Sequence, residues 1–210
     1  MTSAFVATAF ATAFTIIDPV GMIPLTISVT ADATPARRAA IVNQAILVAG
    51  AVILIMGLVG KPLLDSLGIT LPAFTIAGGA LLFLIAVDML FGRNPGTKQT
   101  PEEEREGAES ANPAVFPLAV PMIAGPGTIA TVLVLVTLAA GDGQKLAVVF
   151  AAYVCAMTVT WICMRLSTRL LRVIGTTGVH VITRLFGILL SALAVQFVLN
   201  GLAQTPLLHH

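Results

Sequence analysis

Charged residues are scarce in this sequence. Asp, Glu, Lys and Arg make up 10% of its 210 residues, and hydrophobic residues make up 57%. An ordinary soluble domain carries about 25% charged residues. The mean hydropathy of +0.99 agrees with this composition. A water-soluble domain is therefore excluded, and we expect a single all-helical membrane domain over residues 1–210.

Several chemical signatures are also absent. A net charge of +1 offers no basic stripe for nucleic acid. The sequence has no His-Glu-x-x-His helix, no Walker loop and no dinucleotide fingerprint, and His180 is its one histidine before His209 and His210, which we interpret as the remnant of a tag. We expect no enzyme activity, no metal site and no cofactor beyond a coupling ion.

The cysteines and the aromatic residues Tyr153 and Trp161 do not indicate a chemical site either. Cys155 and Cys163 lie two helical turns apart in one apolar segment, so they cannot form a disulfide within that helix, and we expect them to pack in the bundle. Tyr153 and Trp161 lie in the same segment, where interface anchoring or packing is the expected role. The N-terminus lacks the basic region of a cleavable signal, so we expect it to be retained.

The sequence contains several long apolar runs. Each approaches or exceeds the roughly 20 residues that cross a bilayer as a helix. Six transmembrane helices are predicted, around residues 4–30, 40–60, 72–92, 113–139, 146–166 and 179–201. The longest linker, 93–112, contains five glutamates and no apolar periodicity, which predicts a solvated loop; a partner-docking or regulatory segment is the alternative.

Lysine and arginine are distributed unevenly between the two sides. Linkers two and four hold only Lys61 and Lys145. Linkers one, three and five hold Arg37, Arg38, Arg93, Lys98, Arg105, Arg165, Arg169 and Arg172. The positive-inside rule then predicts a multi-pass protein of the bacterial inner membrane, with the 93–112 loop in the cytoplasm and both termini in the periplasm.

The two halves of the chain resemble each other. A displacement of 107 residues aligns Pro19 with Pro126 and Gly68 with Gly175 without a gap. Repeat one covers about 1–92 and repeat two about 113–202. Three helices per half is an odd number, so the second half enters the membrane in the opposite orientation. Such inverted repeats are common among secondary transporters.

Prolines interrupt the first and fourth predicted helices near mid-membrane. Proline lacks an amide donor and collides with the preceding turn, and neighbouring glycines let the backbone unwind. Unwound backbone at this depth implies a cavity between the halves, whose free amides suit an anionic group. Ordinary proline kinks are the alternative. The predicted substrate-binding residues are Asp18, Pro19, Val20, Gly21, Gly125, Pro126, Gly127 and Thr128.

Three ionisable residues lie inside the predicted spans. Asp18 at mid-span would cost about 2.5–3.5 kcal/mol if it faced lipid. It is interpreted either as an N-cap alone or as a cap that also contacts a substrate ammonium or a coupling proton. Arg184 either snorkels or anchors a carboxylate, and at similar depth it is a candidate gate or ion-pair partner for Asp88.

Three stretches of the sequence resemble the MarC family of bacterial and archaeal inner-membrane proteins. They are Asp18 to Pro24, Gly68 to Gly79 and Phe116 to Gly127, and Arg184 with the following Leu-Phe-Gly also resembles a family pattern. The resemblance covers essentially the whole chain. It implies six helices and, since the family is grouped with neutral amino acid transporters and more distantly with LysE-type exporters, small neutral amino acids as substrate.

We therefore expect a secondary transporter of small neutral amino acids or similar zwitterionic metabolites, which works by alternating access around the two breaks. The alternative is a passive channel or a membrane-embedded interaction subunit. The expected partners are the substrate and membrane lipid, with H+ or Na+ as coupling ion and no nucleic acid. A homo-oligomer, the exact substrate and the direction of transport are left open.

Overall fold

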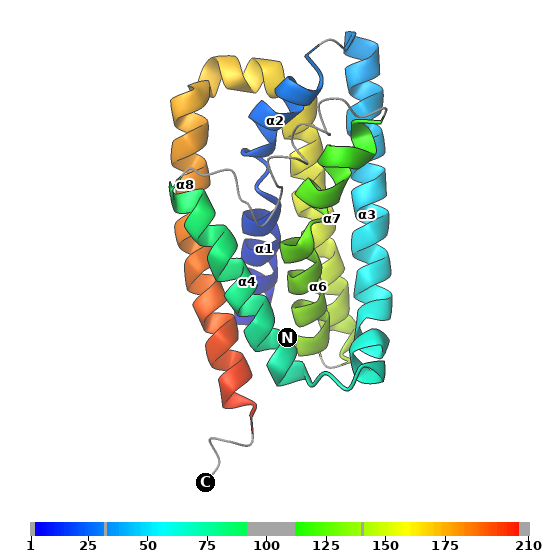
Figure 1. Cartoon of the computed structure of the whole chain (residues 1–210), viewed down its shortest axis with the longest axis vertical. Helices are drawn as coiled ribbons and strands as arrows, with labels where there is room; N and C mark the ends of the chain where they lie inside the picture. Colours follow the sequence, from blue (N-terminus) through cyan, green and yellow to red (C-terminus); the bar gives the residue numbers. More distant parts are fainter. Residues whose placement is uncertain (1–2, 32, 92–111, 140, 206–210) are drawn as a thin grey trace.

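The computed structural model describes residues 3–31, 33–91, 112–139 and 141–205, and within these ranges it contains helices and no strand. They form an elongated bundle (Figure 1). The predicted loop 93–112, apart from Asn112, and His209 and His210 lie outside the described residues. The helices are α1 (Ser3–Ile17), α2 (Met22–Val29), α3 (Pro35–Ser66), α4 (Leu71–Phe91), η1 (Ala114–Ile123), α6 (Pro126–Leu138), α7 (Gly143–Arg165) and α8 (Ser167–Ala203).

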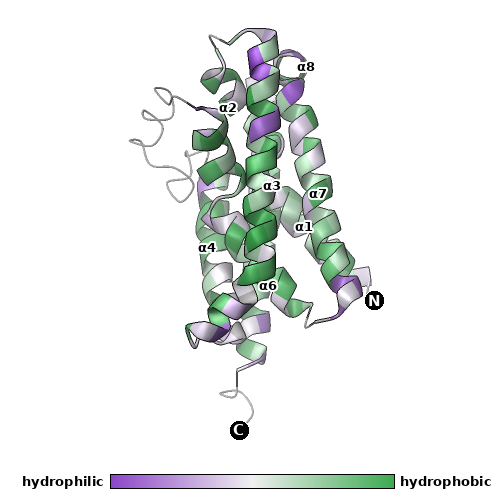
Figure 2. Ribbon diagram, turned by 90° about the vertical axis from the view of Figure 1, so that its right-hand side faces the viewer, coloured by the Kyte–Doolittle hydropathy of each residue, from purple (hydrophilic) through white to green (hydrophobic). Residues whose placement is uncertain are grey.

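Five stretches of the described chain are long and apolar enough to cross a membrane, one of them the combined α1–α2 stretch Ser3–Val29. The fourth predicted segment, 113–139, contains η1 and the shorter apolar helix α6. Hydropathic colouring shows apolar residues along much of the helices and hydrophilic residues gathered toward their ends (Figure 2). The prediction of a helical multi-pass membrane protein is confirmed, while the six-span inverted arrangement stays a prediction.

Local sequence explains where the long helices begin and end. Thr34 caps α3 by accepting a hydrogen bond from the Arg37 amide, and Pro35 occupies the first turn, where no amide donor is needed. Gly68 ends α3 with a φ of 67°. The last long helix starts at Ser167, earlier than the predicted 179, and is interrupted at Gly175, where φ is 71°. Left-handed φ suits glycine because it has no Cβ.

Helices α4 and α8 pack closely and run antiparallel. A Cβ at Gly79 would lie 2.8 Å from the Ala194 carbonyl oxygen, and one at Gly201 would lie 3.0 Å from the Pro72 carbonyl oxygen. Gly187 sits in the same way against Met89. Between membrane helices, close contact of this kind replaces the hydrophobic driving force that water would supply.

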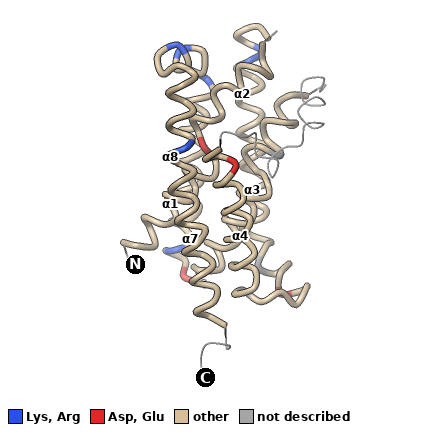
Figure 3. Tube along the Cα trace, turned by 60° about the vertical axis from the view of Figure 1, so that its left-hand side comes forward, with Lys and Arg blue, Asp and Glu red and all other residues tan. Residues whose placement is uncertain are grey.

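The described arginines other than Arg184 gather at one end of the bundle (Figure 3), which we call the basic end. It comprises Arg37, Arg38, Arg165, Arg169 and Arg172. Arg38 donates a hydrogen bond to Thr168 Oγ1 at 2.7 Å, which joins the starts of α3 and α8. The first turn of α1 and the last turn of α8 lie toward the opposite end (Figure 1). The inner-membrane location and the orientation stay predictions.

The close contact between α4 and α8 predicts that a substitution favoured by helix propensity will destabilise the protein. Alanine is favoured over glycine inside a helix by about 1 kcal/mol, but a methyl group at Gly79 meets backbone. We expect Gly79→Ala to destabilise the protein by about 1–3 kcal/mol through overpacking, measured by unfolding in detergent mixtures. Gly143→Ala is the control, because no heavy atom lies within 4 Å of an added Cβ there. Equal stability of the two variants would contradict the contact.

Candidate functional site

The first break separates α1 from α2 at Asp18. The Asp18 amide still donates to the Phe14 carbonyl at 3.1 Å, but the residue then turns to a φ of 51°, and Pro19 offers no amide. The helical turn resumes when Met22 N donates to the Asp18 carbonyl at 3.2 Å. The chain therefore stays helical up to Asp18 and starts again from it.

The Asp18 carboxylate caps the turn that leads into α2. Its Oδ1 accepts a hydrogen bond from the Gly21 amide at 3.0 Å, and Asp18 is only 6% exposed. Gly21 must be small, because an added Cβ would collide with Asp18 Oδ2. Pro19 is buried and Val20 is half-buried. Asp18 thus accepts an amide three residues further on, as the predicted N-cap would, but α2 begins only at Met22 and its own N-cap, Gly21, has no side-chain hydrogen bond. A further role for the charge stays a prediction.

The second break lies between η1 and α6. Phe116 and Val120 adopt extended φ/ψ within η1, because a residue before proline is driven out of the helical region. Gly125 is also extended, with φ −81° and ψ 177°, and Pro126 starts α6 at its first turn. The backbone is therefore irregular from Phe116 to Gly125.

Threonine hydroxyls satisfy carbonyl groups at this second break. Thr128 Oγ1 donates to the Ile123 carbonyl across the break at 2.8 Å. Thr131 lies close to two further carbonyls, those of Gly127 at 3.0 Å and Thr128 at 2.9 Å. Both threonines are buried. The predicted site residues Gly125, Gly127 and Thr128 are also buried, whereas Pro126 is exposed.

The two breaks meet in the interior. A Cβ at Gly127 would collide with Ile85 Cδ1 of α4 and would lie 2.9 Å from Ile16 Cδ1, two residues before Asp18. The structure therefore brings the beginning of α6 against the end of α1, as expected for a shared site. At this contact a methyl group would force the ends of the Ile85 and Ile16 side chains to shift, and the predicted cavity between the halves stays a prediction.

Comparison with known proteins decides the family. The family model described as MarC family integral membrane protein matches residues 3–205. The chain belongs to the MarC family. A UPF0056 membrane protein of Aquifex aeolicus is 37% identical over 194 residues, covering 92% of this chain and 90% of the relative. The UPF0056 membrane protein YhcE of Escherichia coli is 35% identical over 193 residues, covering 90% of this chain and 87% of the relative.

These comparisons confirm the resemblance seen in the sequence. A third relative, a UPF0056 membrane protein of Methanocaldococcus jannaschii, is 35% identical over 193 residues, covering 92% of this chain and 84% of its own. The names of these relatives state a membrane protein and no substrate. No solved structure matches the chain. Family membership therefore establishes an integral membrane protein and leaves the transported molecule to be proposed.

Tyr153 is a residue of this MarC chain that sequence reasoning missed. It was expected to anchor at the interface or to pack, and at 1% exposure it packs. The missed feature is that its hydroxyl donates a hydrogen bond to Thr131 Oγ1 at 2.6 Å. Thr131 lies one turn after Gly127, so Tyr153 connects α7 to the second break. The available signal was that this chain has a single tyrosine, placed in mid-span.

The predicted gate residues lie on the antiparallel pair α4 and α8. Asp88 is half-buried and Arg184 is exposed. Because Gly187 packs against Met89 and Ala86, the two residues are at similar levels along the bundle. Their ion pair stays a prediction. Among the described residues, no group of three or more His, Cys, Asp or Glu could hold a metal ion.

The capping geometry at Asp18 predicts an ordered series of stabilities. Asp18→Ala loses the cap, at about 1 kcal/mol, and places alanine at positive φ, at about 1–2 kcal/mol. Asp18→Asn keeps an oxygen acceptor and tolerates that φ, so it should remain close to wild type. Unfolding in detergent mixtures measures both variants. If Asp18→Asn were as unstable as Asp18→Ala, the cap would depend on charge rather than on geometry.

A double-mutant cycle isolates the contact between Gly21 and Asp18. Gly21→Ala alone should destabilise the protein, because the methyl group displaces the capping carboxylate. In an Asp18→Gly background no carboxylate remains to be displaced. The cost of Gly21→Ala should then fall by about 0.5–3 kcal/mol, the usual coupling of residues in contact. Additive effects would mean that Gly21 is constrained by something other than Asp18.

Proposed function

We propose that this MarC-family protein is a secondary transporter that moves small neutral amino acids or similar small zwitterionic metabolites across the inner membrane by alternating access. The observation that carries the proposal is a buried carboxylate, Asp18, at the break between α1 and α2. This break lies against the second one, because Ile16 of α1 packs on Gly127 at the start of α6. Secondary transporters bind substrates at such paired breaks.

Features 107 residues apart support an inverted repeat. Gly68 and Gly175 have φ values of 67° and 71°, and neither has a heavy atom within 4 Å of an added Cβ. The aligned prolines Pro19 and Pro126 each adjoin a break. The matching φ of the glycine pair, together with a break beside each aligned proline, favours a duplication over chance similarity between apolar segments.

The contacts between helices support the same interpretation. The broken helix of the first half, α1 with α2, packs on α7 and α8 of the second half. The broken helix of the second half, η1 with α6, packs on α3 and α4 of the first half. Helices α4 and α8 pack on each other. This reciprocal exchange is what a pseudo-twofold axis between the halves would produce.

The chemistry of the breaks suits a zwitterion. The Asp18 carboxylate is a candidate partner for a substrate ammonium group or for a coupling H+ or Na+. The start of α6 after Gly125 has free amides and the positive end of a helix dipole, which suit a carboxylate. Because Ile16 fills the space over Gly127, substrate would reach the breaks only when the two halves separate.

The basic end offers a candidate gate for that separation. The Arg38 guanidinium donates to Thr168 Oγ1 at 2.7 Å and to the Thr30 carbonyl at 3.2 Å. These two bonds connect the start of α3 to the second half and to the end of α2. We propose that they break when the basic end opens. The predicted pair of Asp88 and Arg184 would act in the same transition.

Uptake into proteoliposomes tests this function. We expect saturable accumulation of radiolabelled glycine, alanine or serine that depends on a proton or sodium gradient. Asp18→Asn, which keeps the cap, should lower the uptake rate by at least about tenfold. Asp65→Asn is the matched control, since Asp65 is an exposed carboxylate at the end of α3. Gly127→Leu should also abolish uptake by filling the contact with Ile16.

Each other outcome excludes part of the proposal. Flux without saturation would favour the passive channel. No flux of any of these substrates by folded wild-type protein, under either gradient, would remove the amino acid assignment and favour an interaction subunit. Normal uptake by Asp18→Asn would show that the carboxylate is a cap only.

A further inference from the structure

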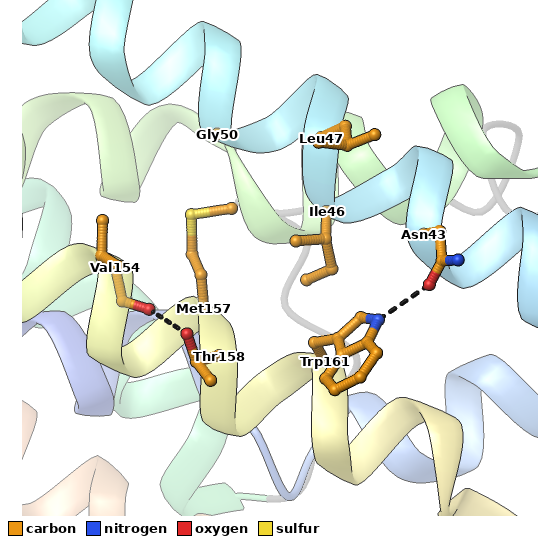
Figure 4. A pocket seen from close by; sticks show the side chains of 8 residues that line it. All are labelled: Asn43, Ile46, Leu47, Gly50, Val154, Met157, Thr158 and Trp161. Atoms are coloured by element: carbon orange, nitrogen blue, oxygen red, sulfur yellow. Dashed lines mark hydrogen bonds between the residues drawn. The ribbon is translucent and has the colours of Figure 1, made fainter.

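A groove of about 500 Å³ lies on the outside of the bundle between α3 and α7. Its lining is mostly apolar and includes Ile46, Leu47, Val154 and Met157 (Figure 4). Gly50, which has no side chain, lies beside Met157. Leu47 is 73% exposed and Val154 is 64% exposed. In a membrane these side chains face lipid. The groove is large enough for a ligand, since small-molecule pockets measure roughly 300–1,000 Å³.

One end of the groove is polar. Trp161 Nε1 donates to Asn43 Oδ1 at 2.8 Å, and the amide nitrogen of Asn43 points away from the tryptophan (Figure 4). The Arg165 guanidinium lies over the Trp161 ring, 5.6 Å from its centroid. The apolar groove thus ends at the amide of Asn43 and at Trp161, and the Arg165 cation lies next to that end, over the tryptophan ring. That order of groups matches an amphipathic ligand with an apolar tail and an anionic head.

The polar end of the groove faces the basic end of the bundle. Trp161 lies one helical turn before Arg165, which ends α7, and Asn43 lies about 12 Å along α3 from Pro35 at 1.5 Å per residue. None of the five arginines of the basic end forms an ion pair with another described residue. Their positive charge is therefore available to an anion from outside the chain.

We propose that this groove binds an anionic phospholipid, with one acyl chain between α3 and α7 and the phosphate at Arg165 and Asn43. A planar guanidinium binds phosphate oxygens in a bidentate manner. Basic pockets between helices on the cytoplasmic side hold anionic headgroups. The site is independent of the transport proposal, because it uses neither break and faces lipid rather than the interior.

A second copy of the chain is a weaker candidate for this surface. A twofold interface formed by this groove would place the basic ends of both copies side by side, with like charges in proximity. A lipid of opposite charge removes that repulsion. The groove extends about 10 Å along each helix, from Asn43 to Gly50 and from Trp161 to Val154.

The chain contains a single tryptophan, Trp161, so its fluorescence reports on this groove directly. The full chain is reconstituted into vesicles that contain bromine-labelled phosphatidylglycerol or bromine-labelled phosphatidylcholine at equal mole fraction. Intensities are normalised to vesicles without bromine. We expect the anionic lipid to be enriched about fivefold at Trp161, and therefore to quench it much more strongly than the zwitterionic lipid.

Two variants separate a built site from diffuse attraction. Arg165→Gln and Arg172→Gln each remove one exposed arginine from the basic end, but only Arg165 contacts Trp161. We expect Arg165→Gln to abolish the preference for the anionic lipid and Arg172→Gln to leave most of it. Gly50→Leu, which fills the groove beside Met157, should reduce quenching by both lipids.

Three results would overturn the proposal. Equal quenching by the two lipids would mean that no headgroup is selected. Equal losses in Arg165→Gln and Arg172→Gln would mean that the basic end attracts anionic lipid without a specific site. Absence of quenching by either lipid, together with cross-linking between copies through Leu47→Cys, would mean that a second copy covers the groove.

Discussion

The structure depends on one constraint: a backbone that leaves the helical conformation inside a membrane must find partners for its amides and carbonyls within the protein. Two side chains provide such partners. The Asp18 carboxylate accepts the Gly21 amide at the first break, and the Thr128 hydroxyl donates to the Ile123 carbonyl at the second. Each break is thereby compatible with burial, and both can lie in the interior, where they meet through Ile16 and Gly127.

Small residues determine how closely the helices around these breaks can approach. Gly127 admits Ile16, Gly79 admits the backbone of α8, and an added Cβ at Gly60 would collide with Leu133 of α6. Lipid tails are as apolar as leucine, so burial alone does not hold membrane helices together, and contact area must come from close packing. The same glycines that build the bundle therefore also position the two breaks against each other.

The sequence predicted the apolar segments and both breaks, because run length and proline chemistry act locally. Pro117 and Pro121 also indicated irregular backbone before the second break, and the irregularity takes the form of extended Phe116 and Val120, the residues that precede them. The early start of α8 was missed because the Ser167 to Ile174 stretch carries arginines and is not apolar enough to be counted as a span. The bond between Tyr153 and Thr131 depends on how α7 packs on α6, which no local pattern encodes.

Capping alone does not account for a carboxylate at position 18. Asparagine is about as good an N-cap as aspartate, and it adopts positive φ with little strain. It would accept the Gly21 amide through its oxygen and would carry no charge into the membrane, where an ionised aspartate costs about 2.5–3.5 kcal/mol. The geometry of the break needs an oxygen acceptor, and Asp18 provides one at 3.0 Å. The hydrogen bond to Gly21 therefore does not by itself explain the charge, and the proposed transport function would give it a role in binding a cation, a proton or a substrate ammonium group.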